Sequence, residues 1–185
     1  MPLLEIQKMT HRFAGLCAVS DFNFAIEPHE LVGIIGPNGA GKTTVLNLIT
    51  GVYRASEGSI KLEGRELVGK TPHQITSLGI ARTFQNIRLF KELSVLDNVR
   101  TAHYGQITYT SVEALLHIGR FRAEERRITN QALDLPAIFK LDHTAGEKAK
   151  NLPYGLQRRL EIARALATEP KLLLLDEPAA GMNPN

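Results

Sequence analysis

The residues with the most specific chemistry are Gly36 to Thr43, which read G-x-x-x-x-G-K-T. Glycines at this spacing let backbone N–H groups curl around phosphate oxygens, and a helix that begins at the end of the loop favours an anion. Lys42 would reach the β- and γ-phosphates, and the Thr43 hydroxyl would complete the coordination of Mg²⁺. The loop therefore predicts binding of ATP or GTP with Mg²⁺. The residues predicted to contact the nucleotide here are Gly36, Pro37, Asn38, Gly39, Ala40, Gly41, Lys42, Thr43 and Thr44.

Two adjacent acidic residues, Asp176 and Glu177, follow the apolar run Leu172 to Leu175. An open α/β sheet places its ligand at the carboxyl ends of buried strands, where these carboxylates would stand. Asp176 would hold Mg²⁺ through water, and Glu177 could polarise the attacking water as a general base. Alone, two acids after a strand are equally typical of a plain surface. Beside a phosphate-binding loop, they indicate nucleotide hydrolysis.

These groups need buried strands and helices to position them. Leu31 to Ile35 form a continuous apolar run, which predicts a strand covered on both faces directly before the loop. Apolar residues at helical spacing predict a helix from Lys42 to Thr50, closed by Gly51. The run Leu172 to Leu175 predicts a second buried strand. The helix before it, ended by Pro170, has an apolar face made of Leu152, Leu156, Leu160, Ala163 and Ala167.

The rest of the chain contains weaker signals. Apolar and polar residues roughly alternate in Leu4 to Met9 and in Phe22 to Ile26, which predicts strands with one buried face. Ser59 to Leu62 resembles half of a hairpin, so we expect a small antiparallel element. Thr71 to Gly79 has the capping chemistry of a short helix. Residues 92–150 are rich in helix formers and predict a mostly helical insertion.

Composition narrows the possible classes of protein. The chain has 185 residues, 43% of them apolar and 22% charged, which predicts one globular domain. Its formal charge of +3 is too small to indicate a nucleic-acid partner. Its one cysteine, Cys17, excludes an intramolecular disulfide framework and a multi-cysteine zinc site. No apolar run reaches the ~18 residues of a membrane span, and no signal peptide begins at Met1, so we expect a cytoplasmic chain.

Besides the phosphate-binding loop, three segments deserve comparison with known families: Thr83-Phe84-Gln85, Leu152 to Arg159, and Asp176-Glu177-Pro178. Together with the loop, they occur in the order and spacing of the ATPases of ABC transporters. The chain resembles this family over essentially its whole length.

The resemblance implies an α/β fold of the P-loop NTPase type. It implies a mainly parallel central sheet, a small antiparallel β element and a helical insertion. It also implies that residues 1–185 form one ABC-type nucleotide-binding domain. We expect a catalytic core at about 1–85 and 160–185 and the helical insertion at about 86–159.

The resemblance also assigns roles to single residues. Phe13 matches the aromatic residue that stacks on adenine in this family, and stacking needs no base-specific hydrogen bond. Gln85 matches the glutamine that touches Mg²⁺ and the attacking water while linking the core to the helical insertion. The implied catalytic residues are Lys42, Gln85 and Glu177, and the implied Mg²⁺ contacts are Thr43, Gln85 and Asp176.

Leu152 to Leu156 match the family signature, usually Leu-Ser-Gly-Gly-Gln, which contacts the nucleotide bound by the other subunit of a dimer. Here only Leu152 and Gly155 remain of that pattern. Pro153 has neither the serine hydroxyl nor a backbone N–H, so two donors to phosphate are lost. The continuation Gln157 to Leu166 strongly resembles the helix that follows the signature. Gly155 is therefore included among the predicted nucleotide contacts.

Two segments, Thr83 to Phe90 and Ala179 to Pro184, resemble the ATPase subunits of branched-chain amino acid importers. This likeness implies an ATP-binding and ATP-hydrolysing subunit that energises such an importer. Its implied partners are a second ABC ATPase subunit, identical or different, transmembrane permease subunits and, indirectly, a solute-binding protein. No nucleic acid is expected. The implied location is the cytoplasmic face of the cell membrane, on which the chain would be peripheral.

Family members continue beyond the point that corresponds to Asn185, with further strands and a histidine that contacts the γ-phosphate. None of the six histidines in the sequence follows Asp176. We therefore expect the C-terminal strands and this histidine to be missing, which leaves hydrolysis by the chain in question. Two alternatives stay open: a shortened nucleotide-binding fragment without efficient hydrolysis, and a subunit of an importer for another solute. A soluble ABC protein of translation or DNA repair and a P-loop kinase fit the motifs less well.

Overall fold

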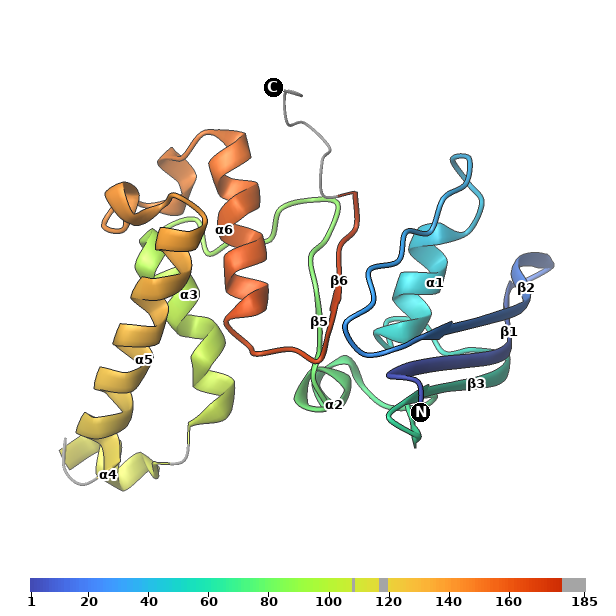
Figure 1. Ribbon diagram of the computed structural model, residues 1–185, viewed down its shortest axis with the longest axis horizontal. Helices are drawn as coiled ribbons and strands as arrows, with labels where there is room; N and C mark the ends of the chain where they lie inside the picture. The colour runs from blue at the N-terminus through green and yellow to red at the C-terminus, as the bar shows by residue number, and fades with distance from the viewer. Residues whose placement is uncertain (108, 117–119, 178–185) are drawn as a thin grey trace. The chain divides into compact units, whose positions relative to one another are not determined.

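The computed structural model describes residues 1–107, 109–116 and 120–177 (Figure 1). The chain divides into two units, Met1–Ile80 and Ala81–Asn185. We describe each unit by itself. The division into a catalytic core and a helical insertion at about residues 86–159 stays a prediction.

The first unit is built on an antiparallel sheet of four strands in the order β2-β1-β3-β4. The strands are β1 (Leu4–Phe13), β2 (Leu16–Ile26), β3 (Glu57–Leu62) and β4 (Arg65–Glu66). Leu4 lies opposite Leu62, and Ile6 lies opposite Ile60, so apolar side chains of β1 and β3 meet on one buried face. The alternation seen in the sequence therefore marks real strands, although β1 and β2 are longer than predicted.

A bulge interrupts the pairing of the central strand β1. The register shifts between Gln7 and Thr10, where Lys8 has a φ of 49°. The Lys8 N–H donates to Oδ1 of Asn23 at 2.8 Å, so a side chain replaces the lost ladder bond. Gly58 on β3 passes this point with a φ of 90°, and a Cβ there would lie 2.5 Å from the backbone oxygens of Gln7 and Lys8. Only glycine fits this crossing.

Two helices complete the first unit, and both were predicted. Helix α1 (Lys42–Ile49) contacts β2 and buries Val45 and Leu48. Helix α2 (Pro72–Ser77) begins with a capping box, in which the Thr71 hydroxyl and the Gln74 side chain accept each other's backbone N–H groups. The positive φ of 105° at Gly79 follows its last turn. The capping chemistry read from the sequence is confirmed.

One predicted element is not a strand in the structure. Residues 31–35 have no regular secondary structure, and Leu31 and Ile35 are 97% and 96% exposed. A strand needs a neighbour whose backbone groups pair with it. Residues 1–80 are all described, and their strand pairs are β1–β2, β1–β3 and β3–β4, none of which includes residues 31–35. An apolar run indicates a preference for burial, but the partner strand decides whether it becomes a strand.

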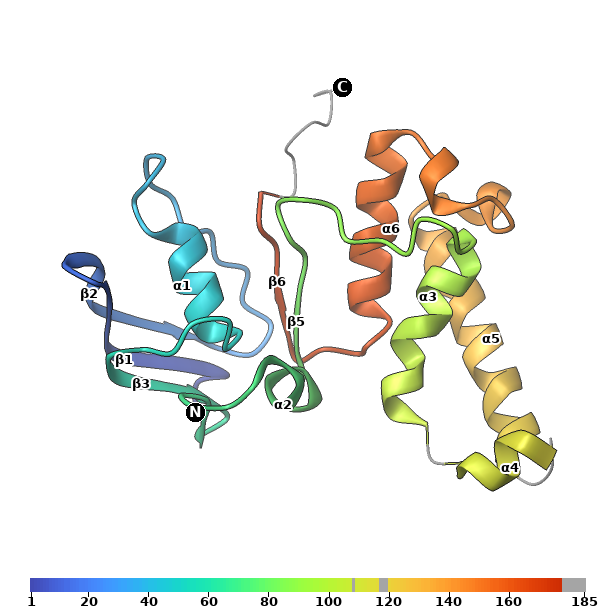
Figure 2. The ribbon, with the colours of Figure 1, turned by 180° about the vertical axis from the view of Figure 1, so that it is seen from behind.

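The strands of the second unit are β5 (Ile80–Arg82), which begins at the unit boundary, and β6 (Leu172–Leu174). They lie side by side and run in the same direction (Figures 1 and 2). The Thr83 N–H donates to the carbonyl oxygen of Leu174 at 3.0 Å, which extends the pairing beyond β5. The acidic pair therefore follows a strand end, as the sequence predicted.

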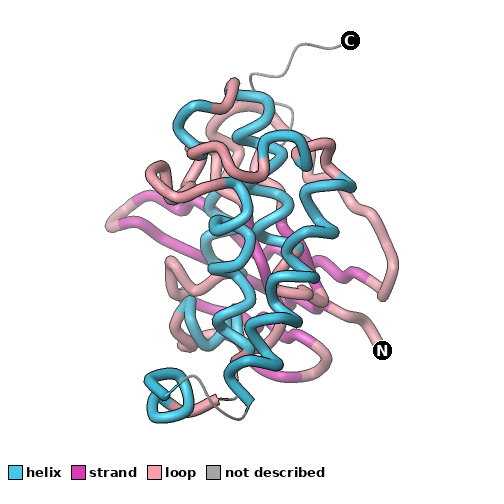
Figure 3. Tube along the Cα trace, turned by 90° about the vertical axis from the view of Figure 1, so that its left-hand side faces the viewer, coloured by secondary structure: helices cyan, strands magenta, loops and turns pink. Residues whose placement is uncertain are grey.

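Helices make up most of the second unit, as predicted (Figure 3). The α-helices are α3 (Val95–His103), α4 (Ser111–Leu116), α5 (Arg120–Ile138) and α6 (Tyr154–Leu166). Three short 3₁₀ helices join them: η1 (Tyr104–Gln106), η2 (Asp142–Thr144) and η3 (Ala149–Asn151). Helices α3 and α5 lie side by side, and α3 also contacts α6 (Figures 1 and 3).

The core of this unit joins α3, α5 and α6. Its buried members are Val95, Val99, Ala132, Leu141, Ala149, Leu152, Leu160, Ala163 and Ala167, with Leu156 packed against them. Every residue of the apolar face predicted for the helix before Pro170 therefore takes part in this core. Among the described helices, none is both long and apolar enough to cross a bilayer.

We expect the bulge glycine to be needed for folding. Gly58→Ala adds a Cβ 2.5 Å from two backbone oxygens and should lower the free energy of unfolding by about 2 kcal/mol more than Gly69→Ala. Gly69 is the matched control because its φ is also positive, at 86°, but a Cβ there meets no atom within 4 Å. Urea unfolding of both variants gives the comparison, and equal losses would contradict the crowding at β1.

The stability of the protein should fall in mild acid because of His103, which is buried at the end of α3. Burial lowers the pKa of His103, the nearby Arg127 lowers it further, and Glu169 opposes the shift. A depressed histidine pKa means that the unfolded state takes up the proton first. Stability should therefore be full above the ordinary value of ~6.5 and should decline below it, by up to about 1 kcal/mol per pH unit.

The test compares urea unfolding at several pH values between 8 and 5.5. His103→Leu should flatten the decline, whereas His143→Leu, at an exposed position in the same unit, should keep it. If the stability of His103→Leu fell with decreasing pH as steeply as that of the wild type, His103 would be excluded as the cause.

Candidate functional site

The phosphate-binding loop lies in the first unit and leads directly into α1. Its two left-handed positions are Gly39, with a φ of 84°, and Gly41, with a φ of 86°. A Cβ at Gly41 would lie 2.8 Å from the carbonyl oxygen of Ala18 on β2, so a side chain is excluded there by space as well as by conformation. The glycines of the motif are therefore required by the local fold.

The end of the loop suits an anion. Gly41 is the N-cap of α1, and no side chain caps the helix, so the N–H groups of its first turn keep their capacity to donate. The N-terminal end of the helix dipole adds positive potential there. Lys42 folds back over the loop, and its Nζ donates to the carbonyl oxygens of Gly36 at 2.6 Å and Pro37 at 2.8 Å. Uncapped N–H groups and a nearby ammonium together fit phosphate oxygens.

Phe13 belongs to a cluster of three aromatic rings at the end of β1. Its ring lies edge-on to His11 at 4.5 Å and to Tyr53 at 5.2 Å between centroids. His11 is buried and stacks on Tyr53 at 5.6 Å, whereas Phe13 keeps 40% of its surface exposed. Phe13 is thus held by two neighbouring rings and is still partly exposed, which suits stacking on a flat base. The sequence did not single out His11 or Tyr53.

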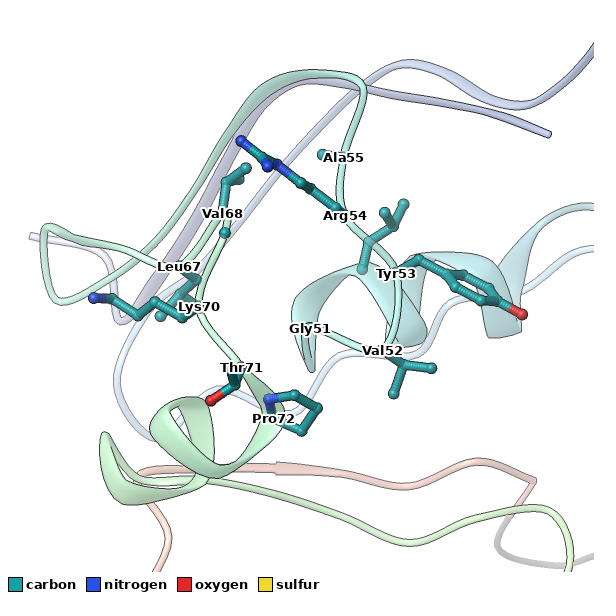
Figure 4. A pocket seen from close by; sticks show the side chains of 12 residues that line it. Gly51, Val52, Tyr53, Arg54, Ala55, Leu67, Val68, Lys70, Thr71 and Pro72 are labelled. Atoms are coloured by element: carbon teal, nitrogen blue, oxygen red, sulfur yellow. The ribbon is translucent and has the colours of Figure 1, made fainter. Parts of the chain in front are cut away.

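A pocket of about 280 Å³ lies in the same unit, between the segment after α1 and the segment before α2 (Figure 4). Leu48 and Leu67 contribute apolar side chains to it, and Arg54 and Lys70 contribute cations. None of the residues predicted to bind nucleotide lines this pocket. It therefore adds no group to the predicted site.

The two predicted acids lie in the second unit, after β6. Asp176 is buried and forms an ion pair with Arg82 of β5, with Nη2 and Oδ2 2.9 Å apart. The guanidinium of Arg82 also lies 5.0 Å from the centre of the Phe84 ring. The pair fixes one carboxylate oxygen of Asp176 and ties the two strands together at their carboxyl ends. Arg82 was not among the predicted site residues.

Gln85 and Glu177 meet in the structure, although 92 residues separate them in the sequence. Nε2 of Gln85 donates to Oε2 of Glu177 at 3.3 Å, and the Glu177 side chain is exposed. Glu177 has a φ of 49°, which is unfavourable for a residue with a Cβ. The predicted general base therefore sits in a strained conformation beside the predicted water-positioning glutamine.

The start of α6 contains what remains of the signature. Pro153 is the N-cap and supplies no side-chain hydrogen bond, while the Gln157 side chain donates to the carbonyl oxygen of Leu152 at 2.8 Å. Gly155 lies in the first turn, and a Cβ there would meet nothing within 4 Å. A partner or ligand can therefore approach this turn closely. The segment 179–184, which supported the narrower likeness, lies outside the described residues.

Two further charged residues of α6, Arg158 and Glu161, contact the backbone around Gln85 and Glu177. The sequence offered only one signal for them, their spacing of three residues on a helix, which many exposed ion pairs share. Their burial could be known only from the fold.

The predicted residues therefore fall into two groups. Phe13 and the loop residues 36–44 lie in the first unit, whereas Gln85, Gly155, Asp176 and Glu177 lie in the second. In the second group the structure brings together Gln85 and Glu177, which are far apart in the sequence.

A family model described as "ABC transporter" matches residues 19–180 of the chain. The chain belongs to the ABC transporter family. Two curated relatives are ATP-binding proteins of high-affinity branched-chain amino acid transport: BraF of Pseudomonas aeruginosa, 44% identical over 183 residues, and LivG of Escherichia coli K12, 46% identical over 184 residues. Each match covers 99% of this chain and 72% of the relative.

Among solved structures, the ADP conformation of MJ1267, an ATP-binding cassette of an ABC transporter, matches with a TM-score of 0.82 and 32% identity. That match covers 100% of this chain and 72% of the other. The likeness confirms the predicted α/β fold of the P-loop NTPase type.

The predicted metal contacts suit Mg²⁺ rather than a protein-only cage. The described residues contain no group of three or more His, Cys, Asp or Glu side chains that could hold a metal ion. Mg²⁺ in nucleotide sites uses one or two protein oxygens together with phosphates and water. Thr43, Gln85 and Asp176 offer a hydroxyl, an amide and a carboxylate, which fit that chemistry.

The Arg82–Asp176 pair should matter for stability because both side chains are buried. Arg82→Met leaves a buried carboxylate without its ion-pair partner and should lower the free energy of unfolding by about 3–5 kcal/mol. Adding Asp176→Asn removes that charge and should recover part of the loss. The matched control is Arg12→Met, because the Arg12–Glu57 pair is exposed and contributes little. If the loss of stability in the double variant, measured by urea unfolding, equalled the sum of the losses in the two single variants, the two side chains would not be coupled.

Proposed function

We propose that this chain is the ATP-binding and ATP-hydrolysing subunit of an ABC importer for branched-chain amino acids. The observation that carries the proposal is a complete phosphate-binding loop at the uncapped N-terminus of α1, in a member of the ABC transporter family. The identity of 46% with LivG, over 99% of the chain, supports the choice of solute.

The first unit supplies nucleotide binding. Phe13 stacks on the adenine ring, and the N–H groups of the loop hold the phosphates. Lys42 exchanges its two loop carbonyls for β- and γ-phosphate oxygens, because a phosphate is a stronger acceptor for an ammonium than a neutral carbonyl. This exchange gives the lysine different partners in the free and the bound protein.

The second unit supplies the groups for hydrolysis. Glu177 accepts a proton from the attacking water. Gln85, which donates a hydrogen bond to Glu177, orients that water. Mg²⁺, when bound, neutralises the charge that develops on the phosphates. Thr43, Gln85 and Asp176 are the side chains that we assign to its coordination, with Asp176 acting through water.

The proposed partners follow from the motifs at α6. Gly155 lies in a first turn with open space, which suits contact with the γ-phosphate held by a second ABC subunit, identical or different. Transmembrane permease subunits carry the solute across the membrane, and a solute-binding protein delivers it. The proposed location is the cytoplasmic face of the membrane, where the chain is peripheral.

The loop lysine gives the first test of this function. Lys42→Ala should reduce ATP hydrolysis by about 100-fold or more, because the ammonium that neutralises the transferred phosphate is lost. ATP-driven uptake of leucine, isoleucine and valine by the protein together with its permease subunits should be abolished. Lys140→Ala, a change of an exposed lysine, is the control and should leave both activities intact.

Glu177→Gln separates binding from hydrolysis. The variant should bind ATP with wild-type affinity but turn it over about 100-fold more slowly, since the amide cannot accept the proton. Undiminished uptake in either variant would refute the proposed function. Wild-type hydrolysis without uptake of any branched-chain amino acid would refute the solute alone.

A further inference from the structure

Arg158 and Glu161 form a buried ion pair one turn apart on α6. Nη1 of Arg158 lies 2.6 Å from Oε2 of Glu161, and the two side chains are only 1% and 2% exposed. Taking both charges out of water is unfavourable unless their remaining hydrogen-bonding groups also find partners. The other hydrogen-bond partners of Arg158 and Glu161 therefore identify the segments that this pair anchors.

The guanidinium of Arg158 donates to backbone oxygens of two separate segments. Nη1 donates to the carbonyl oxygen of Phe84, the residue before Gln85. Nη2 donates to the carbonyl oxygens of Asp176 and, at 3.0 Å, of Glu177. One rigid, planar group thus spans the segment before the glutamine and the segment of the general base.

Glu161 holds the glutamine segment at two backbone N–H groups. Its Oε1 accepts the N–H of Phe84 at 3.4 Å and the N–H of Arg88 at 3.2 Å, while Oε2 is occupied by Arg158. The segment from Phe84 to Arg88 is therefore fixed at both ends. Gln85 lies between these two anchors.

The strain at Glu177 is consistent with such anchoring. Its φ of 49° is a conformation that persists only where the surroundings hold it, and the donation from Arg158 to its carbonyl oxygen is one such contact. Neither Arg158 nor Glu161 has a hydrogen bond to the side chain of Gln85 or Glu177 among the described residues. Both contact the backbone of these segments, through the carbonyl oxygens and N–H groups named above.

We propose that Arg158 and Glu161 are a positioning pair that sets the distance between the side chains of Gln85 and Glu177 and makes it depend on α6. The helix begins with the turn that contains Gly155, so contact at that turn is transmitted through one rigid helix to both reacting side chains. This inference rests on the proposed function, because it assumes that Gln85 and Glu177 handle the attacking water.

The test measures steady-state hydrolysis by Arg158→Met. We expect kcat to fall about 10- to 100-fold, since small displacements of reacting groups have effects of that size. The KM for ATP should change by less than about threefold, because the loop and Phe13 are untouched. Arg126→Met, which removes an exposed arginine of α5, is the matched control and should keep wild-type kcat.

A double variant separates positioning from stability. Arg158→Met with Glu161→Leu removes both buried charges, and an apolar pair of this kind is often as stable as the ion pair that it replaces. It should therefore unfold near the wild-type temperature while kcat stays about 10-fold low or lower. Wild-type kcat in the double variant would overturn the proposal. So would a parallel loss of nucleotide affinity and kcat in it, which would indicate general damage to the fold.

The Lys42→Ala variant, assayed alongside, distinguishes failure of the positioning proposal from failure of the proposed function. If the wild type hydrolyses ATP and Lys42→Ala does not, the function stands, whatever the α6 variants do. Normal kcat in those variants would then remove only the positioning role. If the wild type itself showed no ATP hydrolysis that depends on Lys42, the function would fall, and the positioning role with it.

Discussion

In the second unit, one buried guanidinium joins α6 to the segments that contain Gln85 and Glu177. Arg158 is fully buried in α6, and a charge in that position persists only with a carboxylate and enough acceptors around it. Glu161 and three backbone carbonyls accept hydrogen bonds from Nη1 and Nη2, whereas Nε has no hydrogen-bond partner among the described residues. Because those carbonyls belong to the segments of Gln85 and Glu177, the proposed positioning of these two residues follows from the hydrogen bonds of one buried charge.

Left-handed backbone is accommodated differently in the phosphate-binding loop and at Glu177. The loop before α1 accommodates left-handed backbone with glycine at positions 39 and 41, so the conformation needs no outside support. Glu177, the proposed general base, is also left-handed, with a φ of 49°, but it carries a Cβ, so neighbouring groups must hold it. A site that binds an anion through backbone N–H groups can use glycine, whereas a general base cannot. The tertiary contacts of the second unit meet that second need.

Local patterns predicted much of the fold and part of the site. The capping box at Thr71, the helix after Lys42 and the apolar face that includes Leu160 all depend on residues close in the sequence, and each is confirmed. The apolar run at residues 31–35 predicted a strand that the structure does not have. Such a run records a preference for burial on two faces, but strand formation needs hydrogen bonds from a neighbour, which no local pattern supplies.

The sequence alone predicts nucleotide binding, because the residues of a phosphate-binding loop are contiguous and their types and spacing can be recognised without the fold. Tertiary structure alone decided which charges meet. Arg82 and Asp176 are 94 residues apart, and Arg158 and Phe84 are 74 apart, so their contacts are absent from any window of the sequence. Helical and strand periodicity predict which residues lie on the same face of one helix or strand. A buried ion pair between two elements depends instead on which faces pack against each other.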